Sequence, residues 1–307
     1  MSQNKQAASA VAMIRPHQFS PNTQTALDNS FQIQVEDADK QQLAVNAYQQ
    51  VTSMANKLTS LGIKVYLYED TDTLTPDSVF PNNWFSTHSD GTIALYPMYP
   101  KNRRLERRMD LIRQLQNDFD VQQIIDYSPW EQKAIFLEGT GAMVLDHIER
   151  IAYTVRSNRA NQQALEHFCQ EFNYTPIIFN ACDHQGVDVY HTNVMMCVGS
   201  DFALIGSAMI SSSTERTKVM SQLTRSKKTV IELSQQQIAK FCGNALQLMT
   251  NNGPILALSQ SAYNALSSCQ INALEHHVKL VPFDVSAIET AGGSVRCMLA
   301  SIHLPKP

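Results

Sequence analysis

Three side chains of this 307-residue chain could together carry out nucleophilic catalysis, although they lie far apart in the sequence. Cys297 carries a thiol, and its thiolate form is a strong nucleophile. His191 could accept the thiol proton or protonate a departing amine. Glu138 could accept hydrogen bonds from the nitrogen groups of a substrate and so orient them. The fold has to bring these three residues together.

Their spacing suggests how this happens. Asn83, Glu138, His191, Asn244 and Cys297 follow one another at intervals of 55, 53, 53 and 53 residues. Each residue alone has a plainer explanation: a cysteine in a strand is usually a small buried hydrophobe, and a single histidine or glutamate can border a turn. The shared register favours a common structural position, and therefore a common site.

The elements around these positions repeat in the same order. Apolar residues with helical spacing predict helices at about 39–61, 102–119, 159–173, after the serine run 211–213, and at 261–275. β-prone runs predict three short strands after each helix, the last set completed by an N-terminal strand at 11–15. The runs that hold the register positions lie at 80–88, 135–145, 189–198, 241–249 and around Cys297. We expect them to be the middle strands of their units.

A unit of this size cannot bury its own apolar face, so five units indicate one domain built as a ring. We expect an α/β five-bladed propeller of repeated ββαβ units that spans residues 1–307, with the register residues converging on its axis. Residues 16–34 form a polar, turn-rich connection that is long enough to act as a lid.

Composition excludes several classes of function. A net charge of −4 with interspersed signs argues against nucleic acid or a membrane surface as partner, and no apolar run could span a bilayer. The first ten residues lack the apolar core of a signal peptide, and the six scattered cysteines indicate reduced thiols in the cytoplasm. No metal is expected, since Cys182 and His184 lack partners at ligand spacing.

Two other features, a second cysteine and a run of basic residues, each allow more than one interpretation from the sequence alone. Cys242 is the only rival nucleophile, and it lies two residues out of register. The basic run at 101–108 is interpreted as a solvated helix face or a subunit contact of a homo-oligomer, from which one arginine could reach a substrate carboxylate.

The chain resembles the guanidine-modifying, or pentein, superfamily over nearly its whole length. Its motifs occur in order, together with Arg15-Pro16 and the Asn22…Asp28-Asn29 loop: FPNNWF at 80–85, FLEGTG at 136–141, YHTN at 190–193 and GGSVRCMLA at 292–300. Each motif is weak alone, but the ordered set is specific. The resemblance is nearest to citrulline-utilisation hydrolases (citrulline ureidases), which implies the five-bladed fold.

The resemblance implies roles for individual residues. Cys297 matches the family nucleophile, His191 the acid/base histidine and Glu138 the acidic partner. Arg159 matches an arginine that often binds a substrate carboxylate, which suits its planar fork of donors. Arg296 would point away from the site on an ideal strand, so a structural role is expected for it.

Two departures from the family pattern bear on the substrate. Many relatives that act on arginine carry aspartates where this chain has Asn83 and Asn193. A carboxylate favours the cationic guanidinium, whereas an amide offers N–H donors to a ureido oxygen. These positions are therefore expected to bind a neutral ureido substrate, unless the asparagines only hold loops.

The sequence therefore predicts hydrolysis of L-citrulline to ornithine, CO₂ and ammonia through an S-carbamoyl Cys297, without a cofactor. Arginine deiminase or dimethylarginine dimethylaminohydrolase activity, and amidinotransferase activity, are the alternatives. A non-catalytic metabolite sensor is a further alternative, which the intact Cys297, His191 and Glu138 set argues against.

Overall fold

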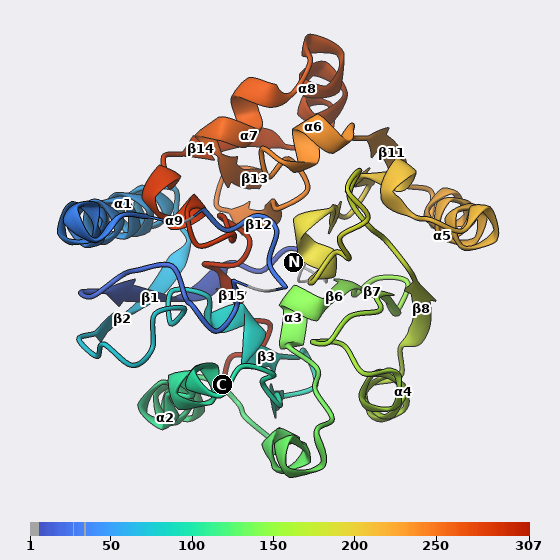
Figure 1. Cartoon of the computed structure of the whole chain (residues 1–307). Coiled ribbons are helices and arrows are strands. Elements are labelled where there is room, and N and C mark those ends of the chain that lie inside the picture. The colour runs from blue at the N-terminus through green and yellow to red at the C-terminus, as the bar shows by residue number, and fades with distance from the viewer. Residues whose placement is uncertain (1–5, 27, 34) are drawn as a thin grey trace.

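The chain folds into five small sheets of three strands each, with helices outside them (Figure 1). The computed structural model describes residues 6–26, 28–33 and 35–307. In each sheet the middle strand is antiparallel to one neighbour and parallel to the other. Four sheets run in sequence order: β3 (Phe85–Thr87), β4 (Thr92–Leu95) and β5 (Gln123–Asp126); β6 (Met143–Asp146), β7 (Ile151–Val155) and β8 (Thr175–Phe179); β9 (Met196–Val198), β10 (Phe202–Ile205) and β11 (Thr229–Glu232); β12 (Leu246–Thr250), β13 (Gly253–Ser259) and β14 (Lys279–Phe283).

The fifth sheet joins the two ends of the chain. It consists of β15 (Ala300–Ser301), β1 (Ala10–Pro16) and β2 (Lys64–Asp70), and β1 pairs with β15 through Val11 opposite Ser301. The expectation that the N-terminal strand completes the last unit is confirmed.

Helices connect the second and third strand of each unit and lie at the periphery in Figure 1. They are α1 (Lys40–Ser60), α2 (Met109–Asp118), α4 (Gln162–Glu171), α5 (Ser213–Arg225), and the pair α7 (Gln260–Ala265) and α8 (Ser268–Glu275). Side chains cap several of them: Asn161 accepts from the amide of Gln163 at the start of α4, and Ser212 accepts from Glu215 in α5. The single helix expected at 261–275 is two helices, because Ser267 forms a capping box with Gln270 and starts a new one.

The first strands of the sheets lie on the inside. β15 contacts β3, and β9 contacts both β6 and β12. The short helix α3 (Gly139–Ala142) lies near the centre of Figure 1 and contacts β3 as well as β6. Two further short helices, α6 (Gln235–Ile238) and α9 (Ser286–Glu289), belong to the connections.

The expected position of the register residues is wrong in one respect. They do not lie in middle strands: each lies in or beside a helical turn that leads into the first strand of its sheet, as at η2 (Pro81–Asn83), α3 and η5 (Thr192–Val194). Cys297 likewise belongs to a turn before β15, where its amide donates to Ser294 O at 2.9 Å. A buried turn and a buried strand present the same apolar run, so periodicity did not separate them.

Candidate active site

The turn that carries Cys297 is shaped by the glycines before it. Gly292 adopts φ = +78°, a conformation that favours glycine, and a Cβ there would lie 2.5 Å from the Asn29 side chain. The hydroxyl of Tyr190 donates to Gly292 O and ties this turn to the segment of His191. Cys297 itself is 3 % exposed.

Two amides face the sulfur of Cys297. Asn193 Nδ2 and Asn244 Nδ2 each donate to Sγ at 3.2 Å. The Asn244 amide also donates to Asn193 O, and its Oδ1 accepts from the amide of Arg296, which fixes its orientation. Two neutral N–H donors are therefore aimed at the sulfur of the candidate nucleophile.

Glu138 and His191 form a hydrogen-bonded pair. His191 Nε2 lies 2.9 Å from Glu138 Oε2, and the other carboxylate oxygen accepts from the amide of Tyr99 at 3.0 Å. Both residues are buried. The absence of a side chain at Gly141 lets its turn pack closely against Asn83 and His191. A Cβ at Gly141 would lie 2.2 Å from Asn83 Nδ2 and 2.8 Å from His191 Nδ1.

Burial and neighbouring charges set the protonation of this pair. Burial alone would raise the pKa of Glu138, but Arg159, His191 and Arg103 outweigh it and lower the pKa to about 2. Burial lowers the pKa of His191 to about 4, against the opposing influence of Glu138. A neutral imidazole beside an ionised carboxylate carries its proton on Nε2, so Nδ1 is left as a base.

Arg103 is a buried cation near the same Glu138 oxygen that His191 contacts. Its guanidinium forms a bidentate pair with Glu106 at 2.9–3.2 Å and lies 3.5 Å from Glu138 and 3.7 Å from Asp77. It also donates to Asn83 Oδ1 at 2.8 Å. A guanidinium can only donate, so this contact fixes the amide of Asn83 with its oxygen toward Arg103.

Asp77 offers an unused acceptor in the same place. Its Oδ2 accepts from Asn22 Nδ2 at 2.7 Å, while Oδ1 is buried without a hydrogen-bond partner among the described residues. Burial raises the pKa of Asp77, and Arg103 opposes this. Asn193 Oδ1, beside the nucleophile, is a second buried acceptor without a partner in the described part of the chain.

Arg159 connects the site to the long N-terminal loop. Its Nε and Nη2 contact the carboxylate of Asp28 at 3.2 and 2.5 Å, and its Nη1 lies 3.7 Å from Glu138. Asn29 Nδ2 donates to Ala291 O, next to the glycine turn. The loop expected as a lid thus contacts the site, although its residues 27 and 34 lie outside the described residues.

The cavity between these groups is small. It is about 10 Å³, room for roughly one water molecule. Cys297 and His191 both line it, although no hydrogen bond joins Sγ to the imidazole within the described residues, and Arg159, Asn83 and Asp77 line it as well. A neutral base, a thiol supported by amide donors and two cations therefore line one small cavity.

The six site residues that the sequence indicated are all brought together: Cys297, His191, Glu138, Asn83, Asn193 and Arg159. Sequence reasoning missed Asp77 and the thiol contact of Asn244. Arg103, in the run interpreted as a solvated helix face or subunit contact, is only 2 % exposed. Its Glu106 at i+3 was the only local signal of an ion pair.

The rival nucleophile does not share these surroundings. Burial raises the pKa of Cys242 to about 12, and its sulfur donates to Ala262 O. All six cysteines are free. Within the described residues, no group of three or more histidines, cysteines or acids could hold a metal ion, and no helix is long and apolar enough to cross a membrane.

Comparison with known proteins relates the chain to enzymes of arginine chemistry. Residues 15–304 match the model of a family described as N,N dimethylarginine dimethylhydrolase, eukaryotic. No curated protein matches the sequence significantly.

Solved structures share the fold at low identity. The N-terminal domain of ArgZ, an arginine dihydrolase from the ornithine-ammonia cycle in Cyanobacteria, superimposes with a TM-score of 0.74 and 15 % identity, covering 96 % of this chain and 98 % of that one. A mutant of AgrE, solved in a binary complex with L-arginine, superimposes with a TM-score of 0.75 and 14 % identity. The match covers 97 % of this chain and 40 % of AgrE. A mutant of DDAH from Pseudomonas aeruginosa, complexed with citrulline, superimposes with a TM-score of 0.63 and 12 % identity. The match covers 96 % of this chain and 100 % of DDAH.

Proposed function

Because the chain belongs to the N,N dimethylarginine dimethylhydrolase family of the guanidine-modifying (pentein) superfamily, we propose that it is a cysteine-dependent hydrolase of L-citrulline. The products are ornithine, CO₂ and ammonia. In this proposal residues 1–307 form one catalytic domain, and the five sheets form the blades of a propeller around the site.

One observation carries the choice of a ureido substrate. Both hydrogen-bond partners of the Cys297 sulfur are neutral amides, from Asn193 and Asn244. The guanidinium groups of Arg103 and Arg159 also line the cavity, and they are paired with Glu106 and Asp28. The oxygen of a neutral ureido group can accept from the amide N–H groups, whereas a guanidinium offers them only donors.

The proposed reaction proceeds in two halves. Neutral His191 takes the proton of the Cys297 thiol, and the thiolate attacks the ureido carbon while amide N–H donors stabilise the developing oxyanion. The protonated imidazole then gives its proton to the departing δ-amine, which releases ornithine and leaves a carbamoyl thioester. His191 next activates water, the C–S bond breaks, and the released carbamate decomposes to CO₂ and ammonia.

The contacts of Glu138 refine its expected role. Its carboxylate oxygens already accept from His191 and from the amide of Tyr99, so it fixes the imidazole and stabilises its protonated form. Orientation of the substrate then falls to other groups. We assign the free oxygen of Asp77 to the α-ammonium group, and Arg159 to the carboxylate once Asp28 has moved away.

A guanidinium substrate is the second candidate. The unpaired acceptors Asp77 Oδ1 and Asn193 Oδ1 would suit the N–H groups of arginine or a methylated arginine. This version predicts citrulline as the product rather than the substrate.

A product assay separates the candidates. Purified protein is incubated with citrulline, arginine, agmatine or dimethylarginine, and ornithine, citrulline and ammonia are measured separately, with Cys297→Ala as the blank. Ornithine and ammonia from citrulline, absent in the variant, are expected. Citrulline formed from arginine while citrulline itself is inert would refute the proposal, and a requirement for an amine acceptor would indicate an amidinotransferase. Wild-type activity in Cys297→Ala would exclude the proposed nucleophile.

A further inference from the structure

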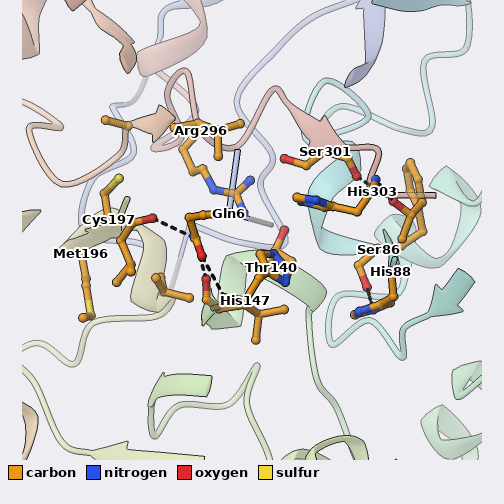
Figure 2. Close-up of a pocket in the computed structure, with 17 residues that line it drawn as sticks. Gln6, Ser86, His88, Thr140, His147, Met196, Cys197, Arg296, Ser301 and His303 are labelled. Carbon is orange, nitrogen blue, oxygen red and sulfur yellow. Dashed lines mark hydrogen bonds between the residues drawn. The ribbon is translucent and has the colours of Figure 1, made fainter. Parts of the chain in front are cut away.

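A second cavity is lined by Arg296, the residue before the nucleophile, together with residues such as Gln6, His147 and His303 (Figure 2). The first strands of all five sheets, β3, β6, β9, β12 and β15, contribute to its wall. Among the described residues, none lines both cavities: Cys297 faces the active site, and its neighbour Arg296 faces the second cavity. The two spaces therefore lie on opposite sides of one turn.

Arg296 carries a positive charge that is paired with no carboxylate in the described part of the chain. Its guanidinium extends into the cavity in Figure 2, and within the described residues its side chain makes one hydrogen bond, from Nη1 to Leu299 O at 3.1 Å. No aspartate or glutamate lines the cavity, and residues 1–5, outside the described part, contain none. Arginine remains ionised in proteins, and an unpaired buried charge is destabilising. The guanidinium therefore lacks a counter-ion.

The other polar groups of the wall are also compatible with an anion. His147 and His303 lie with ring centroids 4.5 Å apart, and Ser301 adds a hydroxyl. Burial lowers the pKa of His303 to about 4, and a neutral imidazole still keeps one N–H donor. Gln6 closes one wall, since its amide bonds Leu145 O, Val198 O and the amide of His147. Arg296 is thus the one permanently charged side chain among the described residues that line the cavity.

We propose that this cavity binds a small inorganic anion of the size of chloride against Arg296. Its volume is about 40 Å³, which holds roughly three water molecules and excludes larger metabolites. The ion would compensate the buried guanidinium and so stabilise the centre of the fold, where the first strands of the five sheets meet.

The test is thermal unfolding of the full chain in sodium chloride and in sodium gluconate at one ionic strength. A ligand that binds only the folded state raises the free energy of unfolding, and above Kd this increase grows with the logarithm of the ligand concentration. We expect Tm to rise with chloride at constant ionic strength and not with gluconate. The rise should vanish in Arg296→Met and persist in Arg113→Met, which removes an exposed cation from α2.

A direct measurement keeps the proposal testable if Arg296→Met fails to fold. Crystals of the wild-type protein grown in bromide should show an anomalous peak beside the Arg296 guanidinium. Equal Tm values in the two salts, a chloride effect that survives in Arg296→Met, or bromide absent from the cavity would each overturn the proposal.

Discussion

Replacing Asn193 by aspartate tests the electrostatic basis of the proposed substrate choice. The change is nearly isosteric and places a carboxylate 3.2 Å from the Cys297 sulfur, where an amide now donates. Two unit charges at that distance repel by ~5 kcal/mol at an effective dielectric constant of about 20. Since about 1.4 kcal/mol is a factor of ten, the thiolate would be disfavoured by three to four orders of magnitude. Relaxation of the side chain reduces this, so a loss of at least ~100-fold in citrulline turnover is expected.

Two assays measure this effect. Ornithine release gives kcat/KM, and alkylation by iodoacetamide, followed on the Cys297 peptide by mass spectrometry across pH, reports the thiolate. In Asn193→Asp the alkylation profile should move to higher pH. Asn161→Asp is the matched control, because it adds the same charge at the N-cap of α4, where aspartate is tolerated. Unchanged alkylation with wild-type turnover, or faster citrulline turnover, would contradict the reasoning.

Three further predictions concern the packing and protonation of the site. Gly141→Ala places a Cβ 2.8 Å from His191 Nδ1, so kcat should fall by ~10-fold or more and stability by ~1–3 kcal/mol; wild-type kinetics would show that the imidazole position is not critical. Arg103→Met removes a cation from its buried carboxylate partners and should lower the free energy of unfolding, measured in urea, by ~3–5 kcal/mol. The control Arg104→Met, at a part-exposed neighbour, should lower it by less than ~1 kcal/mol. Equal losses in the two variants would refute the central role of Arg103. Burial lowers the pKa of His191 from 6.5 to about 4 in the folded protein, so between these pH values the unfolded chain binds more protons than the folded one. The stability that neutral His191 allows is therefore complete above pH 6.5 and is lost as the pH falls to 4. Tm measured across pH should show this loss, reduced in His191→Gln; an unchanged slope in the variant would contradict it.

The architecture was accessible from the sequence because each unit repeats the same order of elements. The interval of 53 residues placed Glu138, His191 and Cys297 at equivalent positions, and the hydrogen bond between Glu138 and His191 shows that equivalence brings two of them into contact. The pairing of β1 with β15 follows from the same logic, since the last unit lacked a strand.

The backbone conformation of the turns and the ion-pair partners could not be predicted from the sequence in this way. The run before β6 is apolar and rich in glycine, but only the fold shows that Gly139 adopts φ = +47° and opens a helical turn. Arg103 sits in a run of exposed-looking cations, and two of its acidic neighbours, Asp77 and Glu138, come from distant segments. Ion pairs between remote segments leave no periodic signal in a sequence.

The small volume of the cavity limits how a substrate reaches Cys297. Room for about one water molecule cannot admit an amino acid, so part of the wall has to move before reaction. In the loop 16–34, Asp28 is 21 % exposed in its pair with Arg159, so water reaches this ion pair more readily than the pairs deeper in the site. Arg103, deeper in the site, is instead fixed by fully buried partners, Glu106 and Glu138. Opening at Asp28 would therefore expose Arg159 to a substrate carboxylate while the Glu138–His191 pair stays in place.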